Sequence, residues 1–255
     1  MLRNPHIIDK RDRAILVGLF LSRFDRYALE SFGFTGFQQA YNVLGFSIGV
    51  KPNSINNYRD EFDPYFPNER KGWHKRELRD YCKEYMDATT DMSFDEFYNV
   101  IKSFLDGGII DESDIVKERR SLSREFMANR LITGKAAEEY FVMNYQSIDI
   151  FHNYELQDTT QMGCGFDFKL SHAQKHFYVE VKGVNEKAGS ILMTEKEHSV
   201  ADDLRTLYCL FIVSNFRETP EHHLFFNPLY VPQLEFKRQE QILTRISYSA
   251  QMSEV

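Results

Sequence analysis

The first half of the chain carries apolar residues at helical spacing. Between residues 15 and 24 they recur every three to four positions, the pattern of a helix with one buried face. Further along, Ser93 and Glu96 have the spacing of a capping box, and Gly107-Gly108 is expected to end the apolar helix that follows. We therefore expect residues from about 12 to 131 to be mainly helical.

The second half has a different hydrophobic pattern. A helix is expected to start at Thr133, and a second one at Thr194. The other segments are short runs of β-branched and aromatic residues separated by glycines, which predict strands. These runs are Phe166–Leu170, Phe177–Val181 and Leu207–Val213.

Length and composition favour two folded domains. The chain has 255 residues, of which 42% are hydrophobic, enough to bury a substantial core. The expected fold class is mixed α and β (α+β), with a helical domain over residues 1–115 and an α/β domain over 116–255. No apolar run is long enough to span a membrane, and residues 1–10 lack the layout of a secretory signal. We therefore expect a cytoplasmic protein.

Cysteine usage and charge narrow the chemistry. The three cysteines lie far apart, which argues against a disulfide framework and against a thiolate zinc site. The net charge of −7 is not typical of a nucleic-acid-binding protein, but local charge decides such binding. Basic residues gather between Arg70 and Lys83, and again between Lys117 and Arg130. The first stretch fits either a DNA contact or a solvated helix face; the second is better interpreted as a solvated face.

The strongest chemical pattern lies on two of the expected strands. Side chains alternate in a strand, so Glu180 and Lys182 point the same way, and a hairpin would bring Asp167 beside Glu180. Two converging carboxylates suit Mg²⁺, and a nearby lysine can orient or deprotonate the attacking water and offset phosphate charge. The alternative interpretation is an exposed Glu–Lys ion pair and an ordinary turn aspartate.

The order of elements adds weight to the catalytic interpretation. Helix, three strands, helix and strand is the αβββαβ core of the PD-(D/E)XK nucleases, which the sequence resembles over about residues 130–230. Within that superfamily it looks most like the branch related to the C-terminal domain of the plant protein NO VEIN, which also occurs in prokaryotic restriction and defence proteins. The matching residues are Gly134-x-x-Ala-Glu138, Gly165-Phe-Asp167, Glu180-Val-Lys182, Thr194-x-x-Glu197 and the strand that ends at Val213.

The resemblance implies roles for particular residues. Mg²⁺, for which Mn²⁺ can substitute, would be held by oxygen ligands from Asp167, Glu180 and the Val181 carbonyl. Lys182 would act on the nucleophilic water. Glu138 would contact the metal or water from the helix, a role that its neighbour Glu139 can also fill.

Two further positions affect this assignment. Phe166 stands before Asp167 where the superfamily often has proline, but the D…E-x-K set is complete, so we expect an active enzyme. Glu197 is open to two interpretations. Thr194 and Glu197 form a capping box, which explains both residues without chemistry, yet Glu197 can also be an additional catalytic carboxylate.

The N-terminal half contains a segment that resembles a helix-turn-helix. A helix over Phe34–Leu44 and a turn over Gly45–Val50 precede a helix start at Lys51-Pro52, and residues 53–62 would be the recognition helix. Its DNA-facing side chains would be Asn53, Ser54, Asn56, Asn57 and Arg59. The basic residues expected to contact phosphates are Arg70, Lys71, Lys75 and Arg76. The alternative is a helical support domain in which Trp73 is a buried anchor.

The function expected from the sequence is a Mg²⁺-dependent DNA endonuclease, type II-like or modification-dependent, of a restriction or defence system. It would act on double-stranded DNA, as a homodimer, with a DNA methyltransferase as a possible genetic partner. A repair or recombination nuclease that reads DNA structure is an alternative. So is a DNA-binding regulator with a silent nuclease-like domain. Nothing resembles an RNA-binding module with paired stacking aromatics.

Overall fold

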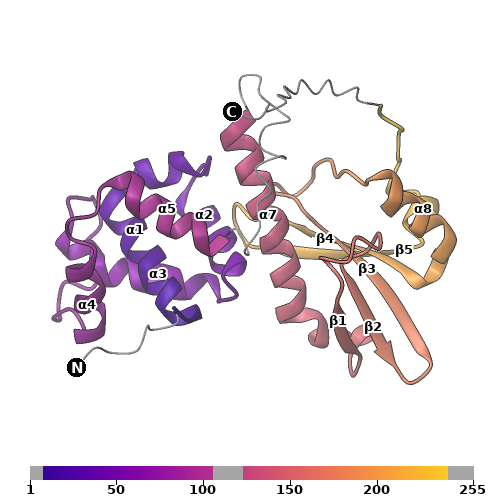
Figure 1. Cartoon of the computed structure of the whole chain (residues 1–255), viewed down its shortest axis with the longest axis horizontal. Helices are drawn as coiled ribbons and strands as arrows, with labels where there is room; N and C mark the ends of the chain where they lie inside the picture. Colours follow the sequence, from indigo (N-terminus) through magenta and orange to yellow (C-terminus); the bar gives the residue numbers. More distant parts are fainter. Residues whose placement is uncertain (1–7, 106–122, 241–255) are drawn as a thin grey trace, which may run out of the picture.

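The computed structural model describes residues 8–105 and 123–240. Figure 1 shows a group of helices beside a twisted sheet, with the long helix α7 running between them. The chain is therefore mixed α and β, with a helical N-terminal part, as the sequence predicted. The predicted domain boundary near residue 115, the pair Gly107-Gly108, and residues 117–120 of the second basic stretch lie outside the described residues.

Five α-helices form the N-terminal part that the structure describes. They are α1 (Lys10–Ser31), α2 (Phe37–Ser47), α3 (Pro52–Phe62), α4 (Asp80–Ala88) and α5 (Phe94–Leu105). Helix α1 carries the core of this part, since every residue from Ala14 to Ser22 is buried. The capping box predicted before α5 is confirmed, because the Ser93 N–H and hydroxyl both donate to the Glu96 carboxylate.

Close helix packing explains one glycine. A Cβ added to Gly18 of α1 would lie 2.5 Å from the Tyr58 Cβ of α3, so only glycine lets these two helices approach so closely. The predicted helix, turn and helix of residues 34–62 are present as α2 and α3, although α2 starts and ends three residues later than predicted.

A five-stranded mixed sheet forms the core of the C-terminal part. Its strands are β1 (Glu155–Asp158), β2 (Phe168–His172), β3 (Lys175–Gly183), β4 (Tyr208–Ser214) and β5 (Glu221–Phe226). They lie side by side in chain order, and only β3 and β4 pair in parallel. Helix α8 (Glu195–Leu204) lies in the connection between these two, as a parallel pair requires. The predicted order of elements is observed, and β5 is an additional strand.

Helix α7 (Ser123–Asn144) starts earlier than predicted. The expected start at Thr133 is wrong, because Thr133 lies inside the helix, where its hydroxyl donates to the Asn129 carbonyl at 2.7 Å. The middle of α7 packs on strand β3. A Cβ added to Gly183 would come within 2.7 Å of the Thr133 carbonyl oxygen.

Buried amide side chains connect the helical and sheet-containing parts. Asn42 of α2 donates to the carbonyls of Phe216 and Glu218 at 2.8 and 2.7 Å. Gln39 donates to Asn185, just beyond β3, at 3.1 Å, and Asn185 in turn donates to Asn129 at 3.0 Å. These bonds fix the end of β3 against α2 and α7.

Across the described ranges, no helix combines the length and the apolar character needed to cross a bilayer.

Candidate active site

Asp167 lies directly before β2, beside the strand that carries Glu180. Its N–H donates to the Val179 carbonyl at 2.9 Å, and Val179 also pairs with Phe168, the first residue of β2. Asp167 is therefore held against residues 179–181 of β3, close enough for its charge to act on Glu180. The Val181 N–H also donates to Asp167 Oδ2 at 2.8 Å, which fixes the carboxylate.

The loop before Asp167 is held in place by α8 and β4. Gly165 has φ +91, and a Cβ there would lie 2.9 Å from Val200 Cγ2 of α8, so glycine is required on both counts. The hydroxyl of the buried Tyr208, the first residue of β4, donates to the Gly165 carbonyl at 3.1 Å. Tyr208 was not among the predicted site residues, because a tyrosine at the start of a strand carries no distinctive signal.

Glu180 and Lys182 lie on the same face of β3, as the strand period predicted. Lys182 Nζ is 2.5 Å from Glu180 Oε1 and 2.9 Å from Glu197 Oε2. The Glu180 side chain is only 4% exposed and that of Lys182 20%. The alternative of an exposed surface ion pair is therefore wrong.

Glu197 has two structural roles. Its Oε2 accepts from the Thr194 N–H at 2.9 Å, and the Thr194 hydroxyl accepts from the Glu197 N–H, which completes the predicted capping box of α8. The same Oε2 also accepts from Lys182 Nζ. The N-terminus of α8 therefore delivers a second carboxylate to the Lys182 ammonium, and a direct catalytic role for Glu197 stays a prediction.

Burial and like charge shift the acid–base properties of this cluster. Burial raises the pKa of Asp167 to about 6. Burial and the charge of Asp167 raise the pKa of Glu180 to about 8. For Lys182, burial opposes the charged form, but the neighbouring carboxylates of Glu180 and Glu197 outweigh it and raise the pKa. Lys182 is thus held as an ammonium between two carboxylates.

Glu138 reaches the same region from α7. Burial, followed by the charge of Asp167, raises the pKa of Glu138 to about 7. The Glu138 carboxylate is therefore close enough to Asp167 to be affected by its charge, and its contact with a metal or water stays a prediction. Glu139 contributes a smaller unfavourable charge to Glu138 and is half-buried. Its alternative role stays untested.

The carboxylates of this site fit a magnesium ion whose remaining ligands come from substrate and water. Within the described residues, no group of three His, Cys, Asp or Glu side chains is arranged to hold a metal by itself. Mg²⁺ usually keeps several waters and takes one or two carboxylates together with substrate phosphates. The neighbouring carboxylates of Asp167 and Glu180 offer such ligands, and burial, the first cause of their raised pKa values, keeps them out of bulk water.

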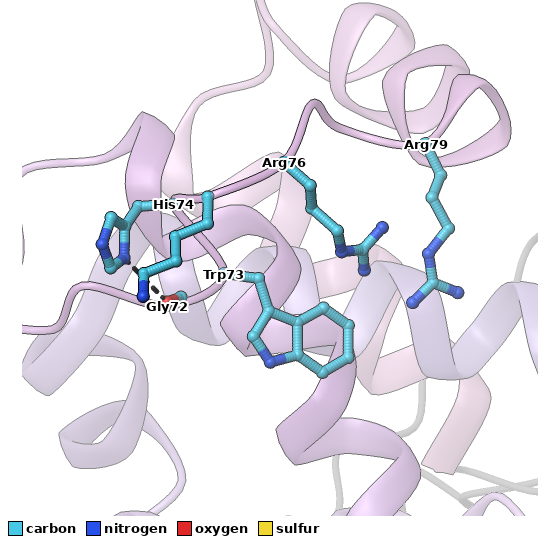
Figure 2. Close-up of a pocket in the computed structure, with 6 residues that line it drawn as sticks. Gly72, Trp73, His74, Arg76 and Arg79 are labelled. Atoms are coloured by element: carbon cyan, nitrogen blue, oxygen red, sulfur yellow. Dashed lines mark hydrogen bonds between the residues drawn. The ribbon is translucent and has the colours of Figure 1, made fainter.

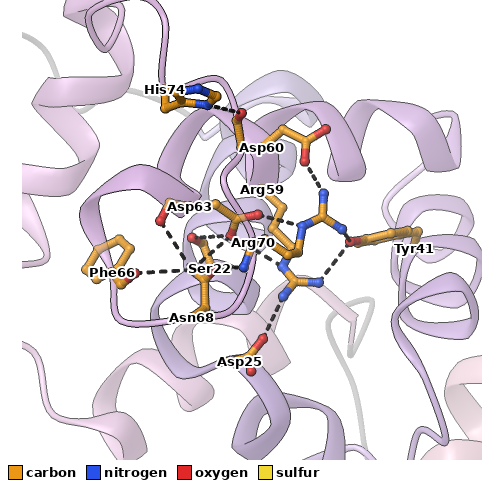
Figure 3. Close-up of polar contacts among 11 residues, drawn as sticks. Ser22, Asp25, Tyr41, Arg59, Asp60, Asp63, Phe66, Asn68, Arg70 and His74 are labelled. Atoms are coloured by element: carbon orange, nitrogen blue, oxygen red, sulfur yellow. Dashed lines mark hydrogen bonds and ion pairs between the residues drawn. The ribbon is translucent and has the colours of Figure 1, made fainter.

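The predicted DNA-reading residues fall into two groups. Asn53 and Asn57 are exposed on α3, and Ser54 and Asn56 are half-buried. Arg59 is a correction, because it is only 1% exposed. Figure 3 shows its guanidinium enclosed by polar partners, with Nη2 2.6 Å from Asp25 Oδ1.

Arg59 therefore stabilises the helical part and cannot contact bases. Its Nη1 also donates to the Tyr41 hydroxyl at 3.0 Å, and its Nε lies 3.5 Å from the Asp63 carboxylate. These partners come from α1, from α2 and from the residue that follows α3.

The predicted phosphate contacts also differ in exposure and pairing. Arg70 pairs with Asp60 and Asp63, and Arg76 pairs with Glu61. Lys71 and Lys75 are exposed and have no ion pair among the described residues. Trp73 is half-buried, and the guanidinium carbon of Arg76 lies over its indole ring, 4.6 Å from the ring centre. Trp73 is therefore not the buried anchor of the alternative interpretation.

The carboxylate cluster lies within a segment that matches a known family. Comparisons with curated proteins and with solved structures found no match. Residues 138–225 match the family model described as "Protein NO VEIN, C-terminal". This segment begins at Glu138 and contains Asp167, Glu180, Lys182 and Glu197, so the sheet-containing part of the chain is similar to a nuclease-like domain family.

Proposed function

We propose that this protein is a Mg²⁺-dependent DNA endonuclease with a PD-(D/E)XK active site. The observation that carries the proposal is the arrangement of Asp167 and Glu180 on facing strands, with Lys182 on the same face as Glu180. The match of residues 138–225 to a nuclease-like family supports it.

Each residue has a definable task in phosphodiester hydrolysis. Asp167 and Glu180 hold the metal, with the Val181 carbonyl as a further oxygen donor. A bound Mg²⁺ ion would polarise the phosphate and lower the pKa of a water molecule. The Val181 N–H orients Asp167 at 2.8 Å, so strand β3 positions the carboxylate of its neighbour.

Lys182 acts best as an ammonium in this arrangement. It contacts Glu180 and Glu197 within 2.9 Å, and both carboxylates favour its charged form. A permanent charge can orient the attacking water and offset negative charge on the phosphate. Proton removal from water then falls to another group, and Glu138, with a pKa of about 7, is suited to that task.

We further propose double-stranded DNA as the substrate and a restriction or defence role. Exposed Asn53, Asn57 and Lys71 offer base-reading and phosphate-binding groups in the helical part. Cutting both strands needs two active sites, so a homodimer is part of the proposal, and a DNA methyltransferase is its expected genetic partner.

Cleavage assays test the proposal directly. Unmodified, methylated and branched DNA are incubated with the protein in Mg²⁺, and the products are mapped. Asp167→Asn and Lys182→Ala should each abolish cleavage. Lys175→Ala, an exposed lysine at the far end of the same strand, should cut normally.

The outcomes separate the competing functions. Fragments from sequence-defined sites support the restriction role, and cleavage of branched DNA alone supports the repair alternative. Tight DNA binding without cleavage of any substrate would support the silent regulator and overturn the proposal.

A further inference from the structure

A hollow of about 460 Å³ lies in the helical part, away from the carboxylate cluster. Figure 2 shows that Trp73 forms one wall, with Arg76 and Arg79 beside its ring. The residues that line it are Gly72, Trp73, His74, Lys75, Arg76 and Arg79. The lining thus combines one large aromatic surface with basic side chains and contains no acidic residue.

The aromatic wall is fixed by the backbone. The Trp73 N–H donates to the Asp60 carbonyl, at the end of α3, at 2.8 Å. The preceding Gly72 has φ +49, and an added Cβ would collide with the same carbonyl oxygen, so the turn requires glycine. His74 Nδ1 lies 3.3 Å from the Gly72 carbonyl oxygen, which closes the turn.

A buried carboxylate positions the two guanidinium groups. Glu61 is 1% exposed and forms ion pairs with both Arg76 and Arg79. Its other oxygen accepts from the Arg79 N–H at 3.1 Å. The guanidinium carbons are thereby held 4.6 and 5.4 Å from the centre of the Trp73 ring.

One carboxylate does not neutralise this group of cations. Glu61 offsets a single charge of the two arginines, and Lys75 is exposed at the rim without an ion pair among the described residues. The hollow therefore favours an anion, and its flat aromatic and guanidinium surfaces favour a planar ring.

We propose that this hollow binds a single nucleotide, with its base against Trp73 and the Arg76 guanidinium and its phosphate near Lys75. A cavity of this size suits a small ligand and is too small to enclose a double helix. The nucleotide is either free or an unpaired unit of a DNA strand. An unpaired unit of a DNA strand as the ligand rests on the proposed function. The affinity of the hollow for a nucleotide does not depend on that function.

The single tryptophan makes the test direct. Since Trp73 is the only tryptophan in the chain, tryptophan-selective fluorescence reports on this hollow alone. The full-length protein is titrated in EDTA with deoxyadenosine monophosphate, a short oligothymidylate, the corresponding duplex and inorganic phosphate. Because no metal is present, the result is independent of cleavage.

We expect saturable quenching by nucleotide or single strand and none by phosphate. Quenching by the monophosphate would identify the ligand as a free nucleotide. Quenching by the oligonucleotide alone would identify it as an unpaired unit of a DNA strand. No saturable quenching, or an equal response to inorganic phosphate or to duplex, would overturn the proposal, even if the protein cleaves DNA.

Variants separate the base contact from the phosphate contact. Lys75→Ala should weaken binding about tenfold with the same quenching at saturation, while Lys175→Ala should bind normally. In anisotropy measurements with a labelled ligand, Trp73→Ala should weaken binding by about tenfold or more, and Trp73→Phe should restore most of it, because stacking on a ring is sequence-tolerant. If Trp73→Ala and Trp73→Phe bound the labelled ligand with equal affinity, the contact between the base and the Trp73 ring would be contradicted.

Discussion

At the scale of single residues, the direction of a side chain is set either by its own strand or by partners far away in the chain. The strand period fixes the directions of Glu180 and Lys182, and the short hairpin leaves little freedom in pairing Asp167 with Glu180. Arg59 could not be placed in this way, because its partner Asp25 lies on another helix, 34 residues earlier. Burial of a charge depends on such distant partners, which no local pattern contains.

Replacing Arg59 tests this correction. Arg59→Ala leaves Asp63 buried without one of its cationic partners, and it should lower the free energy of unfolding by about 3–5 kcal/mol. Asn57→Ala, an exposed change on the same helix, should stay within about 0.5 kcal/mol. Urea unfolding measures both. A small effect of Arg59→Ala would mean that Arg59 is exposed after all.

Glu138 should make stability depend on pH. Its folded-state pKa of about 7 lies above the ordinary 4.5, so the folded state favours the protonated form. The contribution is complete below about pH 4.5 and is lost as pH rises through about 7, on the order of 2–3 kcal/mol. Thermal unfolding of metal-free protein should show a smaller decline between these limits in Glu138→Gln. An unchanged pH profile in the variant would place the carboxylate in solvent.

At the scale of elements, caps and strand periods were informative, but the start of α7 was not recognised. The boxes at Ser93 and Thr194 are present because a cap is settled by a few neighbouring atoms. Thr133 has a cap-forming side chain but lies within α7, where its hydroxyl bonds to the preceding turn. Strand β5, with His222 and His223 in a half-buried edge, has too weak an alternation to be recognised.

The contact of β3 with α7 should be sensitive to a single methyl group. Gly183→Ala forces a Cβ within 2.7 Å of the Thr133 carbonyl and 3.2 Å of Ala137 Cβ, so the strand end must move. We expect a loss of about 2 kcal/mol in stability and weaker cleavage, because Lys182 precedes Gly183. Gly163→Ala is a control for added size, since nothing lies within 4 Å of its Cβ, although its φ of +56 adds some strain. If Gly183→Ala were as stable as the native protein, α7 would have to move away from β3 at little cost in free energy.

At the scale of the whole molecule, the two parts form one hydrogen-bonded unit. Asn42 of α2 bonds to the turn after β4, and Asn185 bonds to both α2 and α7. The sequence indicated two domains, but it contained no sign of their interface, because isolated asparagines and glutamines are unremarkable in a helix or loop.

Removal of one interface side chain should weaken the whole fold. Asn42→Ala leaves the Phe216 carbonyl without its donor in a buried setting, which should cost about 2–3 kcal/mol. Asn57→Ala, an exposed change on α3 outside this network, should cost much less. Differential scanning calorimetry measures both and also shows whether one transition becomes two. No loss in Asn42→Ala would mean that the interface opens freely in solution.

This interface also limits how such a protein can evolve by exchange of parts. A recombination event that attaches a foreign helical part to the sheet would have to supply an amide at the position of Asn42 and another at Gln39. Without them, the new chain would carry unpaired carbonyls near the end of β3. Under the proposed function, specificity should therefore diversify by substitutions on the exposed side of α3 and around Trp73, rather than by transfer of whole modules.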